Sequence, residues 1–174
     1  MNLSKQELAA QAKQTGAALL DTLASFNDEQ FNTQPSYGGW TAGQVAEHLL
    51  LSGGVAEAVH GNTTPTTDRK PDAYCAMIAG IFLDFSTRLQ SPDFILPSGG
   101  YHDKPEMLKK TKLVWERIGE GIDALDLSVT CTDFEMPTVG HLTRLEWLWF
   151  YVWHSQRHLR QLNNIRVAVT AIPA

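Results

Sequence analysis

The chain has 174 residues, of which 43% are hydrophobic and 19% are charged, and its formal net charge is -5. These values are typical of a soluble globular protein with one domain, here expected over residues 1–174, and they exclude a disordered chain. The charged residues are scattered, so the basic stripe of a nucleic-acid-binding protein is absent. The longest apolar stretch, Leu142–Trp153, is too short to span a membrane and contains Arg144 and Glu146.

A cytoplasmic setting is the default expectation. The first residues, Met-Asn-Leu-Ser-Lys-Gln-Glu, lack the apolar core of a secretory signal. The two cysteines, Cys75 and Cys131, form no spacing that is typical of metal ligands.

Helix starts along the chain are marked by capping boxes, in which a side chain accepts an amide three residues on and a Glu or Gln side chain reaches back. The pattern occurs four times, once in a looser form with Pro105 in the first turn: Ser4–Glu7, Thr41–Gln44, Asp103–Glu106 and Thr143–Glu146.

Apolar residues at three-and-four spacing follow these starts and predict amphipathic helices. The expected spans are about 4–26, 41–60, 72–90, 103–125 and 142–165. The segments between them are rich in Gly, Pro, Ser, Thr and Asn and are expected to be loops, with Leu127–Cys131 the one candidate strand. The sequence therefore predicts an all-α fold, a bundle of about four long helices plus one shorter helix.

Three histidines are candidates for one metal site. His154 and His158 are four residues apart and must share a face of their helix, about 6 Å apart along the axis. That face also carries Trp147 and Leu162, so it points to the core, and His48 lies on the inward face of its own helix. Three imidazoles leave a coordination position open, as catalytic sites do. The alternative is that each histidine is an ordinary core residue, although a pair of buried imidazoles would still need partners.

The other histidines do not fit this site. His60 would lie about 18 Å from His48 along a continuous helix, and His141 about 20 Å from His154. His102 precedes a helix start. All three are expected at the surface or in loops.

Aromatic residues between Glu146 and Trp153 cover more than one face of the last helix. We expect one set in the core and another at a second surface, either a dimer interface or the wall of a pocket. This distribution favours a homodimer held by apolar helix faces.

The segments Trp40–Leu49 and Gly140–Trp147, followed by His154-x3-His158-x2-Gln161, resemble the DinB-like superfamily, which includes the YfiT-type metal-dependent hydrolases. The resemblance covers essentially the whole chain. It implies a four-helix bundle, often dimeric, with a divalent ion on His48, His154 and His158. Zinc and nickel are the usual ions in that superfamily, with iron in some branches.

The resemblance also implies candidate reactions. Relatives include S-transferases that use bacillithiol or mycothiol, and mycothiol-dependent maleylpyruvate isomerases. The iron domain of sulfoxide synthases has a related fold with the motif His-x3-His-x-Glu, from which Arg160 departs here.

Three hypotheses follow for function. The first is an enzyme whose metal activates a small nucleophile, either water or a low-molecular-weight thiol, against a small-molecule substrate. The second is a non-catalytic module that binds a metal or small ligand, and the third is a bundle without a metal. Five polar residues lie close to the three histidines if their segments are helical, and they are candidates to hold the ligands in place or to act as acid or base. The sequence does not rank them: Gln44, Glu47, Ser52, Tyr151 and Gln161.

Overall fold

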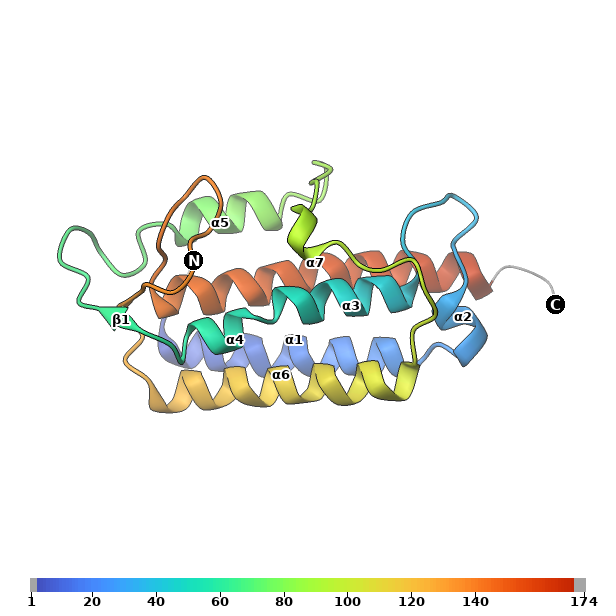
Figure 1. The fold of residues 1–174 in the computed structure, drawn as a ribbon, viewed down its shortest axis with the longest axis horizontal. Helices are drawn as coiled ribbons and strands as arrows, with labels where there is room; N and C mark the ends of the chain where they lie inside the picture. The colour runs from blue at the N-terminus through green and yellow to red at the C-terminus, as the bar shows by residue number, and fades with distance from the viewer. Residues whose placement is uncertain (1–2, 171–174) are drawn as a thin grey trace.

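The main body is a bundle of helices α1 (Lys5–Ala24), α3 (Ala42–Ser52), α6 (Lys104–Ala124) and α7 (Arg144–Thr170), seen in a computed structural model that describes residues 3–170 (Figure 1). Both α1 and α3 contact α6 and α7, so the order around the bundle is α1, α6, α3, α7. The all-α expectation is confirmed.

Smaller elements connect these helices, and β1 and β2 pair antiparallel. Helix α5 lies outside the bundle, against α7 (Figure 1). These elements are α2 (Asp28–Asn32), α4 (Val55–Ala58), β1 (Thr63–Thr64), α5 (Cys75–Phe82), the 3-10 turn η1 (Asp93–Ile95) and β2 (Thr130–Cys131).

The capping residues begin the long helices as expected. The side chains of Ser4 and Asp103 accept the amides of the residues three positions on. Thr41 forms a complete capping box with Gln44. At α7 the Thr143 amide donates to Glu146 Oε2 over 2.9 Å, and the Glu146 amide donates to Thr143 Oγ1 over 3.2 Å. Local side-chain chemistry therefore fixes where these helices begin.

The helix expected over 41–60 is divided in two. It ends at Ser52, and a separate turn, α4, begins at Val55. A Cβ on Gly53 would lie 2.9 Å from the Leu50 carbonyl and 3.1 Å from Val114 of α6. Gly53 thus lets the backbone tighten and lets α6 pack closely against the break.

Helix α5 is shorter than the expected span of 72–90, because it ends at Phe82. The Asp84 carboxylate accepts hydrogen bonds from Ser86 and Thr87, which forms a turn in place of a further helical turn. Arg157 of α7 donates to the carbonyls of Phe82 and Asp84 and so satisfies the end of the helix.

Helix α7 is buried on all sides for its first three turns. Every residue from Glu146 to Ser155 is buried, because α1, α3 and α5 surround this part of the helix. The expected pocket wall is present, because Trp147 and Phe150 of α7 line a cleft, whereas none of these aromatic residues is exposed on an outer face where it could form a dimer interface. Among the described residues no helix has both the length and the apolar character needed to cross a membrane.

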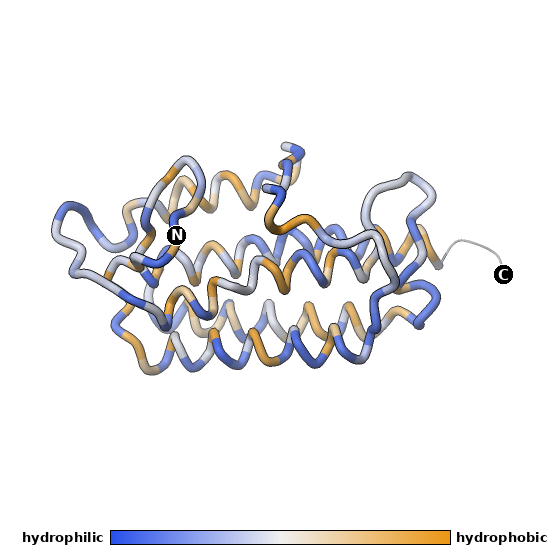
Figure 2. Tube along the Cα trace, viewed as in Figure 1, coloured by the Kyte–Doolittle hydropathy of each residue, from blue (hydrophilic) through white to orange (hydrophobic). Residues whose placement is uncertain are grey.

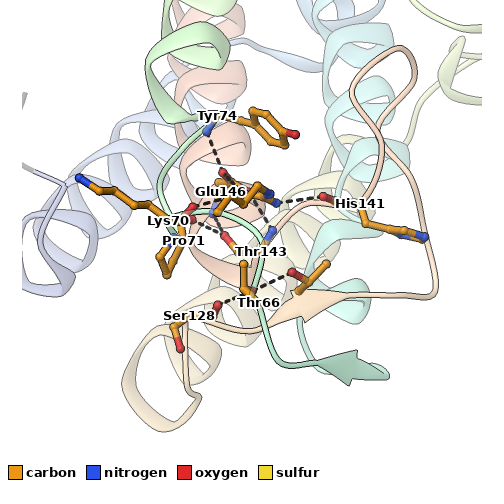
Figure 3. Close-up of polar contacts among 10 residues, drawn as sticks. Thr66, Lys70, Pro71, Tyr74, Ser128, His141, Thr143 and Glu146 are labelled. Atoms are coloured by element: carbon orange, nitrogen blue, oxygen red, sulfur yellow. Dashed lines mark hydrogen bonds and ion pairs between the residues drawn. The ribbon is translucent and has the colours of Figure 1, made fainter.

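A buried ion pair attaches the connecting loops to the start of α7 (Figure 3). The fully buried Glu146 carboxylate accepts from Arg69 Nη1 over 2.7 Å and from the Tyr74 amide over 2.8 Å. The Thr143 hydroxyl donates to the Pro71 carbonyl over 2.7 Å. The carboxylate that caps α7 thus also holds the segment leading to α5.

Candidate metal centre

The three candidate histidines meet between α3 and α7. His154 Nε2 lies 3.1 Å from His48 Nε2 and 3.0 Å from His158 Nε2. The three side chains are all buried, and their ligand atoms lie within 4.8 Å of one another. They form a group that could hold a metal ion, whereas metal binding itself stays a prediction.

Hydrogen bonds fix the direction of two of these rings. His48 Nδ1–H donates to the Ile95 carbonyl over 2.8 Å, and His158 Nδ1–H donates to Gln161 Oε1 over 2.8 Å. With the proton on Nδ1, each Nε2 presents a lone pair toward the centre of the group. This arrangement of an outer acceptor and an inner lone pair is usual for metal-bound histidines.

The donor set fits a divalent ion. The Nε2 atoms of His48 and His158 each present a lone pair to the centre of the group. His154 Nε2 can donate a hydrogen bond to only one of them, so without an ion the lone pair of the other has no donor. Two imidazole nitrogens at about 2.0–2.1 Å from one ion would lie about 2.9–3.4 Å apart at ordinary coordination angles. The observed separations of 3.0 and 3.1 Å lie in that range.

The surroundings keep the three imidazoles neutral. Burial lowers the pKa of His158 to about 3, with the charges of His48 and Arg157 acting in the same direction and Gln161 opposing them. Burial also lowers the pKa of His154 well below its usual value, and that of His48 despite the hydrogen bond to Ile95. Neutral imidazole is the form that binds metals, so no proton has to leave at neutral pH.

Aromatic side chains flank the group. The Trp40 ring lies 4.9 Å from the His48 ring, and the rings of Phe82 and Phe150 each lie 5.2 Å from His154. Such a shell limits water around the imidazoles and strengthens electrostatic interactions within the site.

Residues 91–102, here called the strap, are fastened to α3 beside His48. The Glu47 carboxylate accepts from the Ser98 amide and hydroxyl and from His102 Nε2, the last over 2.8 Å. The side-chain amide of Gln44 donates from Nε2 to the Ser98 carbonyl. A Cβ on Gly43 would lie only 2.7 Å from His102 Cβ, so the strap and α3 are in close contact. The strap thus positions the carbonyl that orients His48.

An open cleft of about 1590 Å³ reaches the three histidines. Its walls come from the segment after α5, from the strap, from residues 133–139 and from α7. Hydrophobic residues of the strap at η1 are visible above α3 in Figure 2. A small molecule can therefore approach the open side of the site.

The polar candidates from the sequence have different positions. Gln161 contacts a ligand, whereas Gln44 and Glu47 hold the strap. Ser52 donates to the His48 backbone carbonyl, and Tyr151 donates to the Leu49 carbonyl. Sequence reasoning missed the Ile95 carbonyl, which no residue type signals, and the roles of Trp40 and Phe82 beside the histidines.

The remaining histidines stay outside the group. His141 is exposed and pairs with Glu135, as expected for a surface residue. His60 is half-buried, and its Nε2–H donates to the Arg117 carbonyl. His102 lies in a loop, as expected, but it is buried and only 3% exposed. The Glu47 carboxylate and the contact with α3 explain its burial.

Fold and site together define a helical-bundle protein with three convergent histidines at the floor of an open cleft. The family model described as the DinB superfamily matches residues 11–162, and the chain belongs to that superfamily. The chain is also similar to the uncharacterized protein YuaE of Bacillus subtilis (strain 168), with 24% identity over 152 residues that cover 83% of this chain and 88% of the relative. No solved structure gives a significant match.

Proposed function

We propose that this protein is a metal-dependent enzyme in which a divalent ion on His48, His154 and His158 activates a small nucleophile. The observation that carries the proposal is the convergence of three Nε2 atoms, 3.0 and 3.1 Å apart, at the floor of a cleft open to small molecules. Zinc or nickel is the expected ion, with iron as a further candidate.

A divalent ion bound there supplies Lewis acidity, which lowers the pKa of a bound water or thiol. The chain itself orients the ligands through Ile95 and Gln161 and limits water through the aromatic shell. No carboxylate of the described residues hydrogen-bonds to any of the three imidazoles. With no carboxylate beside the site, the proton of an activated thiol or water would have to leave to solvent, and a thiol, with an ordinary pKa of about 8.5, would lose it far more readily than water. Transfer of a low-molecular-weight thiol to an electrophile is therefore favoured over hydrolysis.

The same lack of a neighbouring acid or base supports an alternative function. In this alternative the protein binds a metal or small ligand as a stress-response module and does not turn it over. Tight, saturable ligand binding without product would favour this function over the enzyme.

Elemental analysis of untagged protein is the first test, and His158→Ala is its informative variant. The variant is expected to lose most of its metal after chelator challenge and to keep its helical content, because the core is apolar. His141→Ala, an exposed histidine, is the matched control and is expected to keep its metal. Full metal retention by the His158 variant would refute the site.

The reaction is tested with metal-loaded protein, monochlorobimane and bacillithiol, mycothiol or glutathione in turn. The transferase proposal expects conjugation above background with at least one thiol, and loss of that activity after chelation. Metal-loaded protein that conjugates none of them would contradict it.

We also propose a cytoplasmic homodimer. Cys75 and Cys131 are buried free thiols, which are typical of a reducing compartment. The aromatic residues of α7 do not supply the dimer contact, but Met77 of α5 is an exposed apolar side chain outside the cleft. Light scattering at micromolar concentration that gives the monomer mass of 19.3 kDa would overturn the dimer.

A further inference from the structure

One wall of the cleft carries three arginines that lack a carboxylate partner. Arg88, Arg157 and Arg160 all line the cleft, and none forms an ion pair within the described part of the chain. Arg157 donates to the carbonyls of Phe82, Asp84 and Thr87, so its charge is held in place without being neutralised. The concentration of positive charge is unusual in a chain with a net charge of -5.

These arginines lie around one short segment. The Arg160 guanidinium is 4.8 Å from the centre of the Phe85 ring, and Arg157 contacts Thr87, the neighbour of Arg88. Asp84 belongs to the same segment, but its carboxylate is occupied by Ser86 and Thr87 and does not line the cleft.

The acidic residues of the cleft have partners elsewhere. Asp133 accepts from the amide and side chain of Asn62, and Glu57 lies 3.8 Å from Arg117 of α6. Asp133 keeps its charge because Asn62 is neutral, but the three arginines outnumber these two acidic residues of the lining. The arginine wall is therefore the part of the cleft that attracts an anionic ligand.

Much of the remaining lining of the cleft is apolar. Exposed hydrophobic side chains from three segments gather along the cleft, and such a group, unlike a single exposed residue, is typical of a binding surface. They are Ile81, Phe85, Leu89, Phe94, Leu96 and Phe134. A ligand that covers them needs an aromatic or alkyl body.

We propose that the ligand of this cleft is an amphiphilic anion, with an aromatic or alkyl body on the apolar walls and an anionic group such as a carboxylate at Arg88 and Arg160. This names the substrate class of the metal site and in that respect rests on the proposed function. Charge complementarity selects the anionic end, and the apolar walls select the body.

The test compares two fluorescent probes with the same ring system. 1-Anilinonaphthalene-8-sulfonate carries an anionic group, and N-phenyl-1-naphthylamine lacks it. The full chain is titrated with each probe, both metal-loaded and after chelation. The proposal expects tighter binding of the sulfonate, with a difference that decreases as salt is added.

Variants locate the anionic end. Arg88→Gln with Arg160→Gln is expected to weaken sulfonate binding by about twofold to thirtyfold, as loss of two partly exposed ion pairs would, and to leave binding of the neutral amine unchanged. Arg88→Lys with Arg160→Lys keeps both charges and is expected to retain sulfonate binding. Arg166→Gln, on an exposed arginine of α7 outside the cleft, is the matched control.

Equal affinity of the wild type for both probes would overturn the proposal. A loss of sulfonate binding in Arg166→Gln as large as that in the Arg88 and Arg160 variant would also overturn it. Loss of both probes in the Gln variant with unchanged circular dichroism would also overturn it. The metal proposal fails separately: a His158→Ala variant that keeps its metal refutes the metal site, whatever the probes show.

Discussion

Replacement of Gln161 by Leu tests whether the partner of a histidine, and not the histidine alone, sets metal affinity. Gln161 Oε1 accepts the proton of His158 Nδ1 over 2.8 Å, and the imidazole is buried. Without the acceptor the ring can turn in the metal-free protein, but metal binding forces it back with its N–H unsatisfied. An unsatisfied buried donor costs about 1–3 kcal/mol, which corresponds to an increase in Kd of about 5- to 150-fold.

The assay is a competition titration of the metal-free protein against a chromophoric chelator, with circular dichroism to verify folding. Gln156→Leu is the matched control, because Gln156 is also half-buried on α7 but bonds to Gln11 and Thr15 of α1. Gln161→Glu keeps an acceptor and is expected to retain affinity. If Gln161→Leu and Gln156→Leu bind metal equally well, Gln161 does not position His158.

Three further outcomes are expected. Because the pKa of His158 is lowered from 6.5 to about 3 in the folded state, the folded metal-free protein binds fewer protons than the unfolded chain in this pH range. Urea titrations should therefore show the free energy of unfolding decreasing as the pH falls from about 6.5 toward 3. The metal-loaded protein should stay folded to a lower pH, because the ion binds only the folded state. Gly43→Ala should destabilise the fold by about 1–3 kcal/mol, because its Cβ meets the buried imidazole of the strap, whereas Gly119→Ala, in open space on α6, should not lower the melting temperature. Glu146→Gln should cost about 3–5 kcal/mol by leaving Arg69 without its carboxylate; a loss no larger than that for an exposed Lys–Glu pair of α6 would contradict this reading.

The helix starts were predictable because capping is local. Thr41 and Thr143 lie three residues from the side chains that complete their boxes, and tertiary contacts need not intervene. The pairing of His154 with His158 was equally accessible, since helical geometry alone places residues four apart on one face. The sequence thus determined an all-α bundle and placed His154 and His158 on one face, and the inward position of His48 on its own helix predicted the third member of the group.

The remaining features depend on contacts between residues far apart in the chain. Helix α5 ends early because Arg157 donates a hydrogen bond to the carbonyl of its last residue, Phe82. His102 is buried because Glu47, 55 positions away, accepts a hydrogen bond from its Nε2–H. The Ile95 carbonyl orients His48, and a backbone oxygen has no signature in the sequence. Local chemistry therefore set the helices and the histidine pair. Packing decided which loop lies against the third histidine and which side chains face the cleft, because those contacts exist only once the helices have docked.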